Sequence, residues 1–133
     1  MSMTDPIADM LTRIRNAVAS RHRRVDIPVS RVKTEIARIL KENNFIQDYQ
    51  MIDTDDGKHV LRVRLEYAGT GQPVIRSLER VSTPGLRRYV GVNQIPRVRN
   101  GLGLAILSTS QGMMSDREAR QARTGGELVA VVW

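Results

Sequence analysis

Near the start of the chain, apolar residues recur at helical spacing and form one stripe: Ile7, Met10, Leu11, Ile14 and Val18. Asp5 can cap this predicted helix, with Pro6 in its first turn, where the missing N–H costs nothing. The opposite face is polar and carries Asp9, Thr12, Arg13 and Asn16, with Arg15 on its flank. Such a face is either solvated surface or a grip for phosphates, and residue chemistry alone favours solvation.

A second helix is predicted from Arg31 to about Glu42, capped by Ser30, with Val32, Ile36, Ile39 and Leu40 facing inward. Before it, the alternation of Val25, Ile27 and Val29 predicts a short strand. After it, strands are predicted over 45–52 and 59–66 around an Asp-Gly turn, with Leu61, Val63 and Leu65 on one face and Arg62 and Arg64 on the other. The strand–helix–strand crossover predicts that its two flanking strands run parallel.

The Gly-containing stretch Ala68–Pro73 is the best candidate for a linker. We therefore predict an α+β (α/β) fold with two small subdomains. An αβαββ subdomain occupies residues 1–67, a linker 68–73, and a mostly β subdomain with short helices 74–133. In this second part, strands are predicted over 74–81, 86–92, 104–107 and 128–133, with a short helical piece over 93–101.

A third helix is predicted near Asp116, because Ser115 and Glu118 have the spacing of a capping box. Gly125 is expected to end this helix, at Thr124-Gly125. The apolar run that ends at Leu107 is followed directly by Ser108-Thr109-Ser110-Gln111-Gly112, which places small hydrogen-bonding groups at the end of a rigid strand.

The 133-residue chain carries a net charge of +7, which favours a polyanionic partner. Residues 1–70 contain 12 basic and 10 acidic residues, whereas residues 71–133 contain 9 and 4, so most of the positive potential lies in the second half. There is no cysteine, which excludes disulfides and thiolate metal sites and fits a cytosolic protein. The first nine residues lack the basic flank and apolar core of a secretion signal, and no segment is long and apolar enough for a membrane span.

Enzyme and metal signatures are weak. Gly101-Leu102-Gly103 resembles the start of a dinucleotide loop, but it lacks the third glycine and precedes a strand instead of following one. A serine nucleophile needs a nearby base, but the two histidines, His22 and His59, both lie in the first half and neither has a motif context. A small nucleotide-dependent enzyme is the competing class, and the missing phosphate loop argues against it. We expect no metal, no cofactor and no small-molecule substrate.

RNA binding explains more of the second half. The hydroxyls of Ser108, Thr109 and Ser110 can reach ribose 2′-OH groups, phosphates and base edges, and Tyr89 can stack. The glycines at 112, 125 and 126 have no side chain and so allow RNA to approach the backbone closely. Positive charge comes from five arginines: Arg87, Arg88, Arg117, Arg120 and Arg123. A polar strand end stabilised by local turns explains Ser108–Ser110 equally well at this point.

Five segments resemble the bacterial form of the protein eight family of the small ribosomal subunit: Asp5–Ala17 (DPIADMLTRIRNA), Pro84–Tyr89 (PGLRRY), Gly101–Leu107 (GLGLAIL), Ser108–Gly112 (STSQG) and Ala119–Glu127 (ARQARTGGE). The resemblance runs from end to end. It implies a non-enzymatic, cytoplasmic ribosomal protein with two subdomains that binds the central domain of the small-subunit rRNA early in assembly, beside neighbouring ribosomal proteins.

The resemblance also implies the contact residues. The main RNA surface would include Ser108, Thr109, Ser110, Gly112, Tyr89, Gly125, Gly126 and Glu127, together with Arg87 and Arg88. A secondary surface would include Thr4, Arg13, Arg15 and Asn16, which makes phosphate contact as good an explanation of the first helix's polar face as solvation. Gln111 stands where relatives often have a basic residue. Some relatives also repress their own messenger RNA, which is the alternative function.

Overall fold

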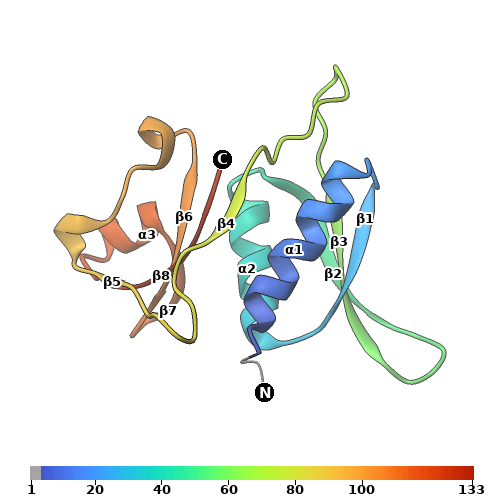
Figure 1. Cartoon of the computed structure of the whole chain (residues 1–133), viewed down its shortest axis with the longest axis horizontal. Helices are drawn as coiled ribbons and strands as arrows, with labels where there is room; N and C mark the ends of the chain where they lie inside the picture. Colours follow the sequence, from blue (N-terminus) through green and yellow to red (C-terminus); the bar gives the residue numbers. More distant parts are fainter. Residues whose placement is uncertain (1–3) are drawn as a thin grey trace. The chain divides into compact units, whose positions relative to one another are not determined.

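The computed structural model describes residues 4–133, and Met1, Ser2 and Met3 lie outside the described residues. It shows helices and two antiparallel sheets, so the predicted α+β class is confirmed (Figure 1). Contacts divide the chain into two compact units. We call Asp9–Arg76 the N-terminal unit, and Ser77–Trp133 with the segment up to Ala8 the C-terminal unit.

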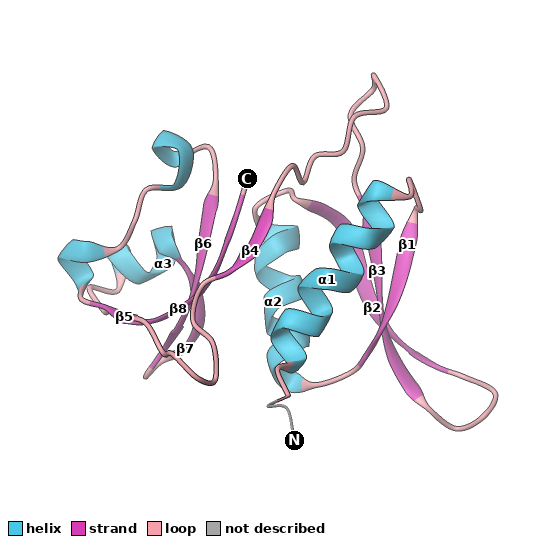
Figure 2. Ribbon diagram, in the orientation of Figure 1, coloured by secondary structure: helices cyan, strands magenta, loops and turns pink. Residues whose placement is uncertain are grey.

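The N-terminal unit contains most of α1 (Pro6–Ala19), then β1 (Arg24–Pro28), α2 (Arg31–Glu42), β2 (Ile46–Asp53) and β3 (His59–Leu65). Its strands are ordered β1-β3-β2, and β3 is antiparallel to both neighbours. The strands that flank α2 are therefore parallel to each other, as predicted, with β3 inserted between them. Figure 2 shows α1 and α2 on one side of this sheet.

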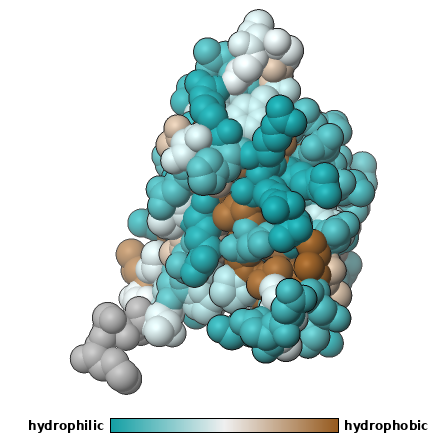
Figure 3. Space-filling model, turned by 90° about the vertical axis from the view of Figure 1, so that its right-hand side faces the viewer, coloured by the Kyte–Doolittle hydropathy of each residue, from teal (hydrophilic) through white to brown (hydrophobic). Residues whose placement is uncertain are grey.

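Apolar and charged residues alternate along β3, and this alternation distinguishes the buried face of the sheet from the exposed one. Leu61 and Val63 are fully buried, whereas Arg62 and Arg64 lie on the other face, as the sequence predicts. Figure 3, which looks onto the side of this unit that carries the sheet in Figure 1, shows a largely hydrophilic surface with a hydrophobic area lower down. The prediction for Val32 is wrong, because its side chain is 41% exposed. Lys33 is buried in its place and donates from Nζ to the carbonyl of Pro28 at 3.0 Å, which satisfies the ammonium while the aliphatic stem packs.

The C-terminal unit contains β4 (Leu78–Arg80), β5 (Tyr89–Val90), η1 (Val92–Gln94), η2 (Val98–Gly101), β6 (Leu104–Thr109), β7 (Gly112–Ser115), α3 (Asp116–Gln121) and β8 (Gly126–Val132). Its sheet is ordered β4-β8-β6-β7, and β5 also pairs with β8. β4 and β5 follow one another along one edge of β8. The strands predicted over 74–81 and 86–92 are present only as the shorter β4 and β5. β7, which pairs with the end of β6, was not predicted.

The core of the C-terminal unit is built around Ile95, Ala105, Leu107 and Ala119, with partly buried apolar residues packed against it, among them Leu128 from β8. α3 starts as predicted, because Ser115 and Glu118 form the capping box. Its predicted end is wrong: the helix ends at Gln121, and Arg123, not Gly125, takes the left-handed conformation with φ 52°. The amide of Thr124 then donates to the carbonyl of Ala119 at 3.0 Å and closes the helix end.

Candidate nucleic-acid interface

Three neighbouring strands bring three of the predicted contact residues into one row. Ser108 of β6 lies directly opposite Glu127 of β8, and Glu127 lies directly opposite Tyr89 of β5. Residues directly opposite each other in antiparallel strands share a face, with Cβ atoms about 5 Å apart. We call Ser108, Glu127 and Tyr89 the central row. Tyr89 is 71% exposed, so its ring is available to a partner.

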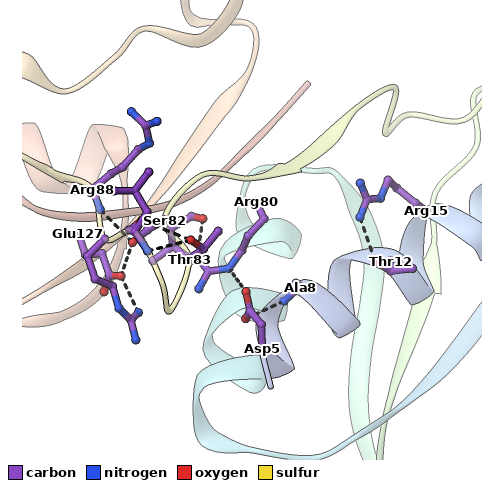
Figure 4. Close-up of polar contacts among 12 residues, drawn as sticks. Asp5, Ala8, Thr12, Arg15, Arg80, Ser82, Thr83, Arg88 and Glu127 are labelled. Atoms are coloured by element: carbon purple, nitrogen blue, oxygen red, sulfur yellow. Dashed lines mark hydrogen bonds and ion pairs between the residues drawn. The ribbon is translucent and has the colours of Figure 1, made fainter. Parts of the chain in front are cut away.

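Glu127 holds the segment between β4 and β5 (Figure 4). Its Oε2 accepts from Ser82 Oγ at 2.5 Å and from Arg87 Nη1 at 2.8 Å. Ser82 Oγ in turn accepts from the amide of Arg88 at 3.1 Å. Burial acts to raise the pKa of Glu127, but the hydrogen bonds from Ser82 and Arg87 and the nearby guanidinium charges outweigh it and hold this pKa below its usual value. The carboxylate therefore positions Arg87 and Arg88 and is turned toward its own chain.

The tip of the β6–β7 hairpin consists of Ser110 and Gln111. Thr109 Oγ1 donates to the carbonyl of Gly112 at 2.8 Å and accepts from the amide of Gln111 at 3.0 Å, so its hydroxyl is used within the turn. Ser110 is exposed, and its side chain makes no hydrogen bond to any residue in the described part of the chain. Gly112 has φ 113°, which favours glycine, and open space lies around it. Of the three hydroxyls, Ser110 is the one available at the tip.

The glycine pair allows the strands of the unit to approach one another. A Cβ on Gly125 would lie 2.2 Å from the carbonyl oxygen of Val90, and one on Gly126 would lie 2.4 Å from that of Ser108. The sequence predicted that RNA could approach the backbone closely at these two glycines. In the structure, the protein's own backbone fills the space beside them. The pair brings β8 between β5 and β6 and so aligns the central row.

The arginines differ in what they contact. Arg88 is exposed, and its guanidinium has no hydrogen-bond or ion-pair partner among residues 4–133. Arg120 is half-buried and donates to the Asp116 carboxylate at 3.0 Å and to the carbonyl of Pro96 at 2.8 Å, so it stabilises the fold. Arg117 donates to the carbonyl of Gly101 at 3.1 Å and stays exposed. Sequence reasoning missed Ser82, which no local motif marks.

The remaining candidates lie at the start of the chain. Thr4 is exposed and directly precedes the cap residue Asp5, whose Oδ1 accepts from the amide of Ala8 at 3.1 Å. On α1, Arg13 pairs with Asp9 at 2.9 Å, and Arg15 donates to Thr12 Oγ1 at 3.0 Å. Arg13, Arg15 and Asn16 are all exposed, with Arg13 and Asn16 on the polar helix face and Arg15 on its flank. An exposed ion pair such as Arg13–Asp9, or an exposed hydrogen bond such as Arg15–Thr12, is weak enough in water for the guanidinium group to exchange its partner.

Across residues 4–133, no helix is long and apolar enough to cross a membrane. The same residues contain no group of three or more histidine, aspartate and glutamate side chains that could hold a metal ion.

Comparison with known proteins gives a consistent result. The model of the family described as ribosomal protein S8 matches residues 5–133. The chain is 56% identical to the small ribosomal subunit protein uS8 of Geobacillus kaustophilus, over the full length of both chains. It is 53% identical to the proteins of that name from Bacillus cytotoxicus and Bacillus cereus, again over the full length of both.

Proposed function

The chain belongs to the ribosomal protein S8 family, and from this membership we propose that it binds the central domain of the small-subunit rRNA through the surface around the central row. As a member of this family it is a structural constituent of the small ribosomal subunit in the cytoplasm and not an enzyme. Its partners are rRNA and other ribosomal proteins. What we propose beyond family membership is which rRNA domain the protein binds and which of its residues contact that domain.

The alignment of Ser108, Glu127 and Tyr89 across β6, β8 and β5 carries this proposal. It places an exposed aromatic ring on β5, one strand away from β6, whose hairpin tip presents the Ser110 hydroxyl. Glu127 holds the Arg87 guanidinium at the same row, and the exposed Arg88 directly precedes Tyr89 in the chain. Folded RNA is recognised by shape, by 2′-OH and phosphate contacts, and by stacking of unpaired bases. An exposed ring, a hydroxyl and two guanidinium groups provide each of these contacts.

The test is equilibrium binding to a fragment of the rRNA central domain, with a fragment of equal length from another rRNA domain as control. We expect tighter binding to the central-domain fragment and a log–log salt slope of several units, because each neutralised phosphate contributes about 0.7–0.9. Equal affinity for the two fragments would refute the domain assignment, and a flat salt response would refute the electrostatic part. The same titration with the leader of its own operon mRNA tests the alternative of translational repression.

A further inference from the structure

The N-terminal unit has a basic hollow where α1 gives way to β1. It measures about 690 Å³ and is lined by His22, Arg23, Arg24, Gln47 and Arg64. A second hollow of about 410 Å³ shares Arg23 and Gln47 with it and is also lined by Arg21. In Figure 1 this turn lies at the upper end of α1, and the corresponding upper part of the surface in Figure 3 is hydrophilic.

The backbone of the turn is fixed from several sides. The amides of Arg21 and His22 donate to the carbonyls of Val18 and Ala17 at 3.1 and 2.9 Å, which closes the end of α1. Arg21 takes the left-handed conformation with φ 58°, a position that normally favours glycine. The carbonyl of His22 accepts from the hydroxyl of Tyr67 at 2.5 Å. These contacts hold the turn in place, so the side chains that line the hollow start from a rigid base.

Two arginines face each other across this hollow without an acid between them. Arg24 of β1 lies directly opposite Arg64 of β3, and like charges in such a cross-strand pair are destabilising. Asp26, the acid nearest along β1, is engaged by Arg62 through two contacts of 2.8 and 3.0 Å. Asp48 lies 3.4 Å from Arg64 on its other side. Arg64 therefore has an acid on one side and a second guanidinium on the other, and Asp26, the acid that also attracts Arg24, is already engaged by Arg62.

The two arginines at the start of β1 lack a salt bridge of their own to any residue that the structure describes. The guanidinium groups of Arg23 and Arg24 have no ion-pair partner within the described range 4–133. Glu66 lines the adjoining hollow and not the larger one. Gln47 lies in the interruption of the β2–β3 register between Ile46 and Asp48, and such bulges redirect a side chain. Its amide adds a neutral hydrogen-bonding group to a cluster of positive charge.

We propose that this hollow binds the sugar–phosphate backbone of RNA, as a second contact separate from the central row. Rigidly based guanidinium groups that repel one another are stabilised by an anion placed between them, and phosphate matches the planar donor geometry of arginine. The lining of the larger hollow contains no phenylalanine, tyrosine or tryptophan, and three of its five residues are arginines, so we assign its contacts to phosphates, independent of sequence. The proposal rests on the proposed function in one respect, which is that the ligand is RNA.

The test compares two double variants of equal charge, R23Q/R24Q in the hollow and R31Q/R76Q outside it. All four arginines are exposed, and their guanidinium groups form no hydrogen bond or salt bridge with residues 4–133. For the central-domain fragment, we expect the first variant to lower the salt slope by about 2 and the second to change it much less. R24Q alone should leave the melting temperature unchanged or raised, because it removes the repulsion with Arg64. An equal loss of slope in both double variants would overturn the proposal.

Two further experiments distinguish a failure of the hollow from a failure of the central-row surface. If S110A leaves RNA affinity unchanged while R23Q/R24Q weakens it, the hollow stands and the central-row surface fails. The opposite pattern removes the hollow and keeps the proposed function. Amide NMR shifts during titration with a ten-nucleotide single-stranded RNA should concentrate at residues 21–24, 47 and 64 in the wild type. Shifts spread evenly over all exposed arginines, or saturation of the same amides by inorganic pyrophosphate at lower concentration than RNA, would also overturn an RNA-backbone site.

Discussion

The hydroxyl of Ser82 donates to the Glu127 carboxylate at 2.5 Å, across 45 positions of sequence. Ser82 is fully buried, and its Oγ also accepts from the amide of Arg88. One hydroxyl therefore satisfies a carboxylate of β8 and a backbone donor just before β5. Since Arg87 contacts the same carboxylate, the geometry of the proposed RNA surface depends on a residue that does not itself reach that surface.

Replacement of Ser82 by alanine tests this dependence. We expect S82A to lower the free energy of unfolding by about 1–3 kcal/mol, because a buried amide loses its acceptor and a carboxylate loses a donor. RNA affinity should fall as well, through displacement of Arg87 and Arg88. Ser77, whose hydroxyl lies 3.4 Å from Glu79 at an exposed site, provides the control: S77A should change stability by less than about 0.5 kcal/mol. Chemical denaturation of both variants measures these changes in stability. Equal denaturation midpoints for S82A and S77A would contradict the role of Ser82.

The depressed pKa of Glu127 predicts a pH dependence. Its stabilising effect is present in full above the usual carboxyl value of 4.5 and is lost as the pH falls through the lower folded-state value. The difference in melting temperature between the wild type and E127Q should therefore be largest near neutrality and should shrink only below about pH 4.5. Differential scanning calorimetry across this range measures it. A difference that stays constant into strong acid would show that the charge of Glu127 contributes nothing.

Local patterns were sufficient to predict the elements whose determinants are local. The apolar stripe of α1, the Asp5 cap and the capping box at Ser115 all depend on residues a few positions apart, and each is present in the structure. The end of α3 was mispredicted because Gly125 is needed for the close approach of β5 and not for a helix cap. A local rule cannot distinguish these two uses of one glycine.

The central row shows why the site was only partly predictable. Ser108 and Tyr89 were named as contacts from their chemistry, and Glu127 only from the family resemblance. The alignment of the three depends on the register of β5, β6 and β8, which no short-range signal specifies. Ser82 was missed for the same reason, since its partner lies in another strand. The sequence also could not distinguish Thr109 from Ser110, whereas the structure uses the Thr109 hydroxyl within the turn.

That distinction gives a prediction for the hairpin tip. S110A should lower affinity for the central-domain RNA by about fivefold, equivalent to about 1 kcal/mol for one lost hydrogen bond, with an unchanged melting temperature. T109V removes the two hydrogen bonds that hold the turn and should lower the melting temperature as well as the affinity. Parallel thermal melts and filter binding separate the two effects. A destabilised S110A with unchanged binding per folded molecule would make the tip structural only.

The glycine pair predicts a steric effect on the same surface. In G126A the new Cβ would meet the carbonyl oxygen of Ser108 at 2.4 Å, so β6 and β8 must move apart. Forcing apart well-packed backbone costs about 1–3 kcal/mol, and the central row should lose its alignment and its RNA affinity. G69A is the matched control, because Gly69 has open space around it and no left-handed φ. Equal stability of the two variants would mean that β8 can shift without affecting the fold.

Asp5 combines two functions that substitution can separate. Its Oδ1 caps α1 through the amide of Ala8, and its Oδ2 accepts from Arg80 Nε at 3.1 Å, where the Arg80 side chain is only 9% exposed. D5A should cost about 1 kcal/mol for the cap and a further 1–2 kcal/mol for leaving a largely buried guanidinium without its acid. D5N keeps a good cap but removes the charge, so its urea midpoint should fall between those of the wild type and D5A. If D5N has the same urea midpoint as D5A, the ion pair with Arg80 accounts for the whole loss of stability. If D5N has the same midpoint as the wild type, the loss of stability in D5A comes from the cap.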